Sequence, residues 1–215
     1  MSTTQPDGYL ALPPSGKGRP VLVLHAWWGL NDAIKTLCER LAGAGFVAFA
    51  ADLYHGKVTD QIAEAGILGS ALDENVDQAR ADLADAVAFL KKHAESVNSE
   101  GMAVIGFSLG AFYALDLSAN DPENIRSVVV FYGAGPADFS KSKADYLGHF
   151  AENDEYEPKS NMDALEEALK RAGRTVNLYY YSGAGHWFFE PDRTDAYDQA
   201  AASLAWDRTL AFLRR

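Results

Sequence analysis

Short apolar runs alternate with amphipathic stretches along this chain of 215 residues. The apolar runs have the length of strands and carry few polar residues, which is typical of strands buried on both faces of a parallel sheet. We expect strands at 21–24, 46–50, 102–105, 128–131, 146–150 and 176–181. Helical periodicity predicts helices at about 32–44, 73–94, 111–115, 161–172 and 194–213. This alternation predicts an α/β fold with a mostly parallel central sheet and helices on both faces.

One domain is enough to hold this series of elements. A chain of this length can bury a full core as a single α/β unit, so we expect one domain over residues 1–215. Residues 1–8 are polar and are expected to be flexible. Residues 132–144 join two predicted strands and are too few to form a cap domain, which predicts an open site.

The net charge and the single cysteine limit the kinds of binding partner and the cellular location that we expect. The formal net charge of −11 disfavours binding to nucleic acid and to anionic membrane surfaces. No apolar run has the length of a membrane span and the N-terminus lacks the features of a signal peptide, so a cytoplasmic location is expected. The one cysteine, Cys38, excludes an internal disulfide and a cysteine zinc site, and its helical context predicts a buried thiol. We expect no metal or other cofactor.

The pentapeptide Gly106-Phe107-Ser108-Leu109-Gly110 has the pattern G-x-S-x-G and lies between a predicted strand and a predicted helix. In a strand–turn–helix elbow the serine hydroxyl is exposed at the sheet edge, and the two glycines let backbone pass closely. The Leu109 N–H would then point from a helix N-terminus toward a developing oxyanion. The alternative is a glycine-rich turn in which the serine only caps the helix.

A serine nucleophile needs a base, and that base needs a carboxylate to orient it. In a parallel sheet such groups come from the loops that follow the strands. His186 lies in a glycine-bounded loop after the last predicted strand, and the loop after the preceding strand is acidic. Asp154 is preferred there, although spacing alone leaves Glu152, Glu155 and Asp145 open. We therefore predict Ser108 as nucleophile, His186 as base and Asp154 as the orienting acid, in the chain order of the α/β-hydrolases.

The other four histidines are weaker candidates for the base. His93 lies in a charged helical segment and is expected to be solvated, and His149 lies within a predicted strand, as core residues do. His25 and His55 follow predicted strands and could line the site, but both precede the nucleophile in the chain.

Four segments of the chain carry a family likeness. They are the G-x-S-x-G pentapeptide, ADLY at 51–54, HFAENDEYEP at 149–158 and AGHWF at 184–188. Together they resemble the dienelactone hydrolase family, and the likeness runs from about Val21 to the C-terminus. The resemblance implies the α/β-hydrolase fold, hydrolysis of an ester or lactone, and a triad of Ser108, Asp154 and His186.

Three positions depart from the pattern of that family. Ser108 stands where its best-known members have cysteine, and Ala26 where they have a glutamate that helps to ionise that cysteine. The two changes agree, because a serine activated by His186 needs no thiolate. Glu190 stands near the place of an arginine that binds a substrate carboxylate in the family, which disfavours a dicarboxylate-like lactone as the substrate.

The loops expected around the site are rich in aromatic residues. By resemblance, the backbone N–H of Trp27 would pair with that of Leu109 in an oxyanion hole. Candidates for an apolar acyl or alcohol pocket are Trp28, Tyr54, Phe107 and Trp187. The alternative is ordinary packing beneath the loops, which we expect for at least half of the aromatic residues there.

These observations predict a cofactor-independent serine hydrolase that cleaves small to medium carboxylic esters or lactones through an acyl-serine intermediate. The alternatives are a non-catalytic binding or regulatory protein on the same fold and an acyl transferase or perhydrolase with the same triad. The expected partner is a small-molecule ester or lactone, and the sequence leaves the oligomeric state open.

Overall fold

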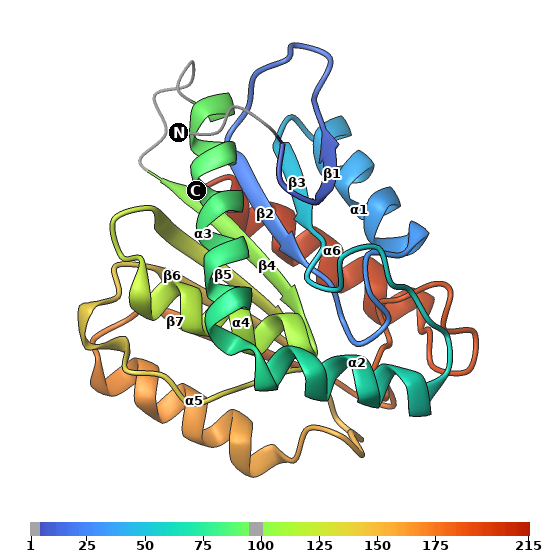
Figure 1. Cartoon of the computed structure of the whole chain (residues 1–215). Coiled ribbons are helices and arrows are strands. Elements are labelled where there is room, and N and C mark those ends of the chain that lie inside the picture. Colours follow the sequence, from blue (N-terminus) through green and yellow to red (C-terminus); the bar gives the residue numbers. More distant parts are fainter. Residues whose placement is uncertain (1–4, 95–100) are drawn as a thin grey trace. The chain divides into compact units, whose positions relative to one another are not determined.

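The computed structural model of the chain describes residues 5–94 and 101–215 (Figure 1). Within these ranges the strands follow the order β1-β3-β2-β4-β5-β6-β7 in the sheet. β1 is antiparallel to β3, whereas β2 with β3, β5 with β6 and β6 with β7 are parallel. The predicted α/β class with a mostly parallel sheet is confirmed.

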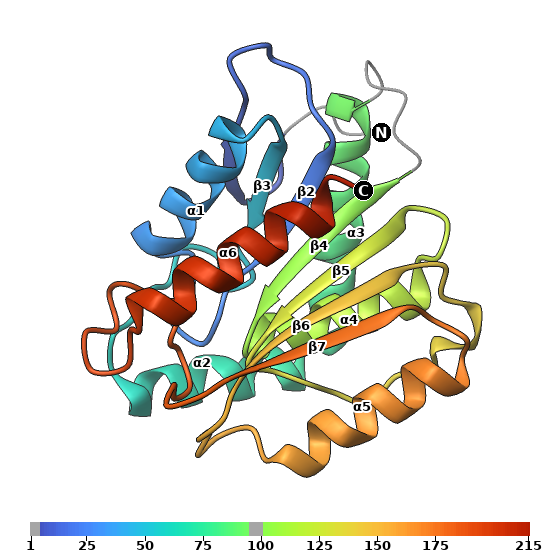
Figure 2. The same ribbon diagram turned by 180° about the vertical axis from the view of Figure 1, so that it is seen from behind.

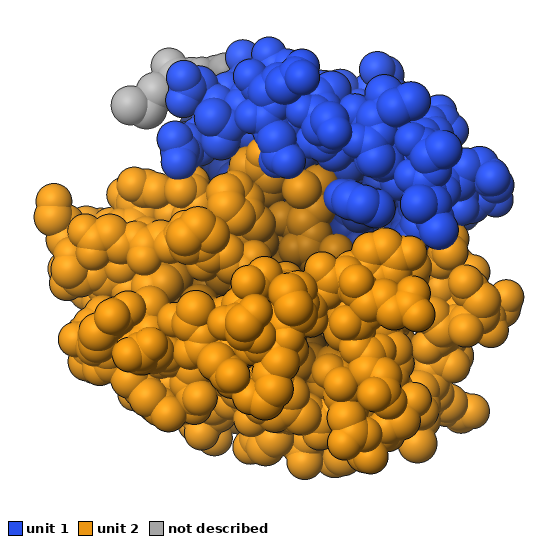
Figure 3. All heavy atoms as spheres, turned by 90° about the horizontal axis from the view of Figure 1, so that it is seen from below, with its two compact units in different colours: residues 1–104 blue, residues 105–215 orange. Residues whose placement is uncertain are grey.

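The chain divides into two compact units, residues 1–104 and 105–215 (Figure 3). The division falls within β4 (Met102–Phe107). The single domain that the chain length predicts stays a prediction, and each unit is described by itself.

The first unit builds a small three-strand layer between helices. Its elements are β1 (Gly8–Ala11), β2 (Pro20–Leu24), α1 (Asp32–Gly43), β3 (Val47–Ala51), α2 (Ile62–Glu74) and α3 (Val76–Ala94). β2 and β3 are buried along their whole length, as their continuous apolar runs predict. α1 and α3 pack on opposite faces of this layer, as the two opposed views show (Figures 1 and 2). Cys38 is buried on α1, as predicted.

The structure of this unit differs from the sequence predictions at the start of α3 and near the N-terminus. The prediction of one helix over 73–94 is wrong at its start, because Asn75 ends α2 by donating from Nδ2 to the Ala71 carbonyl at 2.8 Å, and α3 begins at Val76. At the N-terminus, Gly8 already pairs with Ala51 in β1. Residues 1–4 of the segment expected to be flexible lie outside the described residues.

The second unit continues the α/β pattern. Its elements after the end of β4 are α4 (Leu109–Asn120), β5 (Ile125–Phe131), η1 (Phe139–Lys141), β6 (Asp145–Ala151), α5 (Lys159–Arg171), β7 (Val176–Tyr181) and α6 (Gln199–Leu213). α4 packs on β5 and α6 on β6, from opposite faces (Figures 1 and 2). Residues 132–144 contain only the short turn η1, so this connection forms no cap. Along the described stretches, no helix has the length and apolar content to cross a membrane.

The turn from β4 into α4 requires glycine on both sides. Ser108 has φ 49° and ψ −112°, which is a conformation that side-chain-bearing residues rarely adopt. A Cβ on Gly106 would lie 2.3 Å from the Gly110 carbonyl oxygen, and one on Gly133 would lie 2.5 Å from the Ser108 carbonyl oxygen. The backbone therefore closes around Ser108 from both β4 and the end of β5.

We expect Gly106→Ala to lower the free energy of unfolding by about 3 kcal/mol, because the new methyl group meets backbone atoms that cannot move aside. Urea denaturation measures the change. Gly43→Ala is the matched control: a Cβ at Gly43 meets nothing within 4 Å, and the substitution should be neutral or stabilising. Equal stability of the two variants would contradict the proposed close approach.

Candidate active site

Ser108 lies between the end of β4 and the first residue of α4. It is half-buried, and its N–H donates to the Phe131 carbonyl at 2.9 Å. This bond anchors the strained residue to the neighbouring strand β5. The strain and the anchor together hold the hydroxyl at the carboxyl end of the strands, where ligands of parallel sheets bind.

The structure brings the three residues of the predicted triad together within the second unit. Ser108 Oγ lies 2.9 Å from Nε2 of His186, and His186 Nδ1 lies 2.8 Å from each carboxylate oxygen of Asp154. The side chains of His186 and Asp154 are 5 % and 2 % exposed, so this chain of hydrogen bonds is shielded from solvent. With Nδ1 donating to the carboxylate, Nε2 is left to accept the serine proton.

The acidic turn after β6 explains why Asp154 is the carboxylate beside the histidine. Asp154 Oδ1 also accepts the backbone N–H groups of Tyr156 and Glu157, each at 2.9 Å. Glu152 points elsewhere, accepting from Ser182 Oγ at 2.7 Å. Glu155 is exposed. The turn therefore fixes one carboxylate against His186 and uses its neighbours for other contacts.

Three aromatic rings surround the imidazole of His186. The ring centroids of Tyr132, Tyr156 and Trp187 lie 4.9, 5.1 and 4.9 Å from it. Tyr132 and Trp187 have positive φ values of 38° and 63°. The imidazole is thus held by packing as well as by its hydrogen bonds.

The two predicted oxyanion donors lie in different units. Leu109 is the first residue of α4, so its N–H has no acceptor within that helix and carries the positive end of the helix dipole. Trp27 is half-buried in the first unit. Their pairing in one oxyanion hole stays a prediction.

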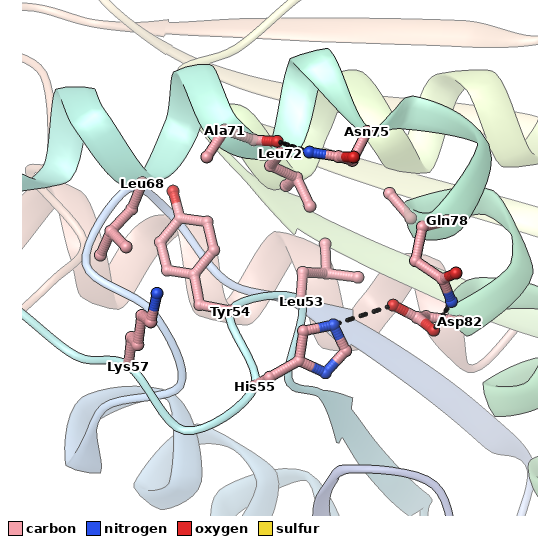
Figure 4. Close-up of a pocket in the computed structure, with 11 residues that line it drawn as sticks. Leu53, Tyr54, His55, Lys57, Leu68, Ala71, Leu72, Asn75, Gln78 and Asp82 are labelled. Carbon is pink, nitrogen blue, oxygen red and sulfur yellow. Dashed lines mark hydrogen bonds and ion pairs between the residues drawn. The ribbon is translucent and has the colours of Figure 1, made fainter.

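The predicted pocket aromatics fall into different environments. Phe107 is 1 % exposed and stacks on Phe131 and Phe189, and Trp28 is 2 % exposed, which agrees with the packing alternative. Trp187 lies beside His186. Tyr54 lines a cavity of about 300 Å³ in the first unit (Figure 4). That cavity is bounded by Leu53, Tyr54, His55, Lys57, Leu68, Ala71, Leu72, Asn75, Gln78, Ala79 and Asp82.

Two of the remaining histidines are buried and fully paired. His149 bonds Tyr181 Oη at 2.8 Å and Thr209 Oγ1 at 3.0 Å, which confirms the expectation of a core residue. His25 accepts the Leu53 N–H at Nε2, and its Nδ1 lies 2.7 Å from the Ala26 carbonyl. Burial lowers the pKa of both imidazoles.

The other two histidines lie nearer the surface. His55 is exposed and forms ion pairs with Asp7 and Asp82 across its two ring nitrogens, one of them drawn in Figure 4. His93 is half-buried against the Phe89 ring and is therefore less solvated than predicted.

Glu190 carries a buried carboxyl close to the triad, and the sequence analysis did not predict that it contacts a residue of the site. Tyr132 Oη donates to Glu190 Oε1 at 2.7 Å, and Glu190 is only 2 % exposed. Burial raises its pKa to about 8, while the hydrogen bond from Tyr132 opposes this rise. The sequence signal is a single glutamate that ends the aromatic run Trp187-Phe188-Phe189, a position where a charged group must be buried with its neighbours.

The fold is that of the α/β-hydrolases, with a hydrogen-bonded serine, aspartate and histidine after β4, β6 and β7. Residues 7–215 match the family model described as "Dienelactone hydrolase family", and the chain belongs to this family. The resemblance seen in the four sequence segments is thereby confirmed.

Relatives cover nearly the whole chain. "Protein usf" of Aquifex pyrophilus is 34 % identical over 214 residues, covering 96 % of this chain and 92 % of its own. A Bradyrhizobium protein named "Probable 2-oxo-3-(5-oxofuran-2-ylidene)propanoate lactonase" is 32 % identical over 222 residues, covering 96 % and 88 %. Membership of this family makes the chain a hydrolase.

A solved structure supports the fold. The crystal structure of a dienelactone hydrolase-like promiscuous phosphotriesterase from metagenomic libraries superposes with a TM-score of 0.86 at 22 % identity. The alignment covers 98 % of this chain and 96 % of the other. At this identity the likeness concerns the fold alone.

The buried His149 predicts an acid-sensitive core. Burial, together with the nearby charge of Arg208, lowers its pKa to about 3 from the ordinary value of 6.5. Between about pH 6.5 and pH 3, His149 is therefore protonated in the unfolded chain but neutral in the folded chain. The free energy of unfolding falls as the pH drops through this range, by an amount on the order of a few kcal/mol.

In His149→Phe this share of the acid sensitivity should disappear, even though the variant is less stable at pH 7 because Tyr181 and Thr209 lose their partner. Urea midpoints between pH 7 and pH 4 test this. His93→Gln should keep the wild-type acid dependence, and an unchanged slope in His149→Phe would contradict the assignment.

Proposed function

We propose that the chain is a serine hydrolase that cleaves small to medium carboxylic esters or lactones through an acyl-serine intermediate. The observation that carries the proposal is the shielded hydrogen-bond chain from Ser108 Oγ through His186 to Asp154. A neutral serine becomes a nucleophile when a base lies within hydrogen-bond reach and a carboxylate orients that base.

In the proposed mechanism, Ser108 Oγ attacks the carbonyl carbon of the ester as its proton passes to His186 Nε2. Asp154 stabilises the resulting imidazolium. The carbonyl oxygen becomes an oxyanion, for which the Leu109 N–H is one proposed donor and the Trp27 N–H the second.

Collapse of this tetrahedral intermediate breaks the bond to the alcohol oxygen, which takes the proton from His186. Water, deprotonated by His186, then attacks the acyl-serine carbonyl, and a second collapse releases the acid and restores the Ser108 hydroxyl. A lactone follows the same steps, with its alcohol oxygen tethered to its acyl group.

The proposed substrate is a neutral ester or lactone of modest size. The connection 132–144 forms no cap that would enclose a long acyl chain. Glu190, near the place of the family's carboxylate-binding arginine, is buried beside Tyr132 and offers no cation to an anionic substrate. The name of the Bradyrhizobium relative supports lactones within the proposed class.

Replacing Ser108 with alanine should reduce hydrolysis of a neutral aryl acetate by about 1,000-fold or more, because the nucleophile is removed. A fluorophosphonate should label the wild-type protein at Ser108, as read by mass spectrometry of its peptides. Ser182→Ala is the matched control, since this exposed serine lies near His186 in the chain but bonds only Glu152 in the interactions described. Retained turnover in Ser108→Ala, or an unlabelled Ser108, would favour a binding protein on the same fold.

Replacing Asp154 with asparagine should lower kcat by roughly 1,000- to 10,000-fold, because an amide stabilises neither the tautomer nor the imidazolium. Glu152→Gln, in the same turn, is expected to leave turnover unchanged. Rates of aryl acetate hydrolysis at pH 7 compare the two. Similar losses in both variants would mean that the acid has been assigned to the wrong residue.

A further inference from the structure

A buried pair of polar side chains lies directly behind the triad histidine. Tyr132 is 0 % and Glu190 2 % exposed, and the tyrosine hydroxyl donates to Glu190 Oε1 at 2.7 Å. Glu190 Oε2 has no hydrogen-bond partner within the described residues. Burying a polar pair in this way costs free energy, so its place beside the site calls for a reason.

Tyr132 connects this pair to the triad. It directly follows β5, has the strained φ of 38°, and its N–H donates to the His149 carbonyl at 2.8 Å. Its ring lies 4.9 Å from the imidazole of His186, and the next residue, Gly133, packs against the Ser108 carbonyl. A displacement of Tyr132 would therefore reach both the base and the nucleophile.

We propose that Glu190 is a positioning residue for the base: it holds Tyr132 through the buried hydrogen bond, and the Tyr132 ring holds the imidazole of His186 in line with Ser108. The inference rests on the proposed function, since it concerns the same site. Glu190 itself touches no reacting atom. Its effect should be on turnover rather than on substrate binding, because misplacement of a base lowers the rate of the chemical step.

The protonation state of Glu190 makes the stability of the folded chain depend on pH. Burial raises the pKa of Glu190 to about 8, and the charge of Asp192 also raises it. The hydrogen bond from Tyr132 and the charge of Arg193 lower it. Burial, reinforced by Glu190 and by the charges of Asp192 and Asp154, raises the pKa of Tyr132 well above 10, so the tyrosine stays a donor. Above about pH 8 the carboxyl becomes an ion in the interior.

The sign of the linkage follows from this upward shift. Between the ordinary value of 4.5 and about 8 the folded protein keeps a proton that the unfolded chain has lost. The stability due to this group is therefore fully present below pH 4.5 and is lost as the pH rises to about 8. The hydrogen bond from Tyr132 persists when Glu190 ionises, because a carboxylate accepts it at least as well as a carboxylic acid does, so this window concerns stability and not the position of His186.

The test compares Glu190→Gln, Glu190→Leu and Tyr132→Phe with the wild type in kcat, KM and urea midpoint from pH 6 to pH 9.5. Glutamine keeps the acceptor but cannot ionise, so Glu190→Gln should match wild-type kcat and lose the alkaline loss of stability. Glu190→Leu and Tyr132→Phe remove the hydrogen bond and should lower kcat by about 10- to 100-fold with little change in KM.

Tyr146→Phe is the control for a merely structural role. Tyr146 is a buried tyrosine of β6 whose hydroxyl bonds Ser118 and Ser142 in the same unit, so its loss should lower stability without changing kcat or the pH profile. A kcat lowered as much in Glu190→Gln as in Glu190→Leu, or wild-type kcat in Glu190→Leu and Tyr132→Phe, would overturn the inference. If either result came with an inactive Ser108→Ala and a labelled Ser108, the proposed function would stand and only the role of Glu190 would fall.

Discussion

The strained backbone at Ser108 is the constraint on which the rest of the site depends. A non-glycine residue at φ 49° costs on the order of 1–3 kcal/mol and persists only where its surroundings impose it. Here the surroundings are the bond to the Phe131 carbonyl and the close backbone approach at Gly106 and Gly133. Tyr132 and Trp187, two of the three rings near the imidazole of His186, are strained in the same sense. Of the four described non-glycine residues with positive φ, three therefore belong to this site, and His55 in the first unit is the fourth.

The sequence predicts the strands better than the helices, for a physical reason. Strands buried on both faces must be apolar throughout, and β7 at Val176–Tyr181 has the expected bounds. α2 was not predicted because its buried face is built from small residues, Ala65 and Gly69 among them, which give little hydrophobic periodicity. β1 is a short strand at the sheet edge, half-exposed over three of its four residues, and it was not predicted although Tyr9, Leu10 and Ala11 are apolar.

The candidate site was predictable in its residue types and only partly in its geometry. The G-x-S-x-G motif singled out Ser108, and a glycine-bounded loop after the last strand singled out His186, because each group must follow a strand of the same sheet. The choice of Asp154 among neighbouring acids needed the family likeness, since it depends on which carboxylate receives the backbone N–H groups of its own turn. The Tyr132–Glu190 pair could not be foreseen, because no pattern along the chain states that a glutamate and a tyrosine 58 residues apart share a buried hydrogen bond.

The three departures from the family pattern form one electrostatic arrangement. A serine nucleophile is neutral at rest, so the site needs neither the glutamate replaced by Ala26 nor a cation to support a thiolate. Burial raises the pKa of Glu190 to about 8, and Asp154 is hydrogen-bonded by two backbone N–H groups and by His186. In the proposed mechanism, charge separates only as the ester carbonyl is attacked. Fixed dipoles aimed at that developing charge stabilise the transition state more than the ground state, which is the condition for catalysis.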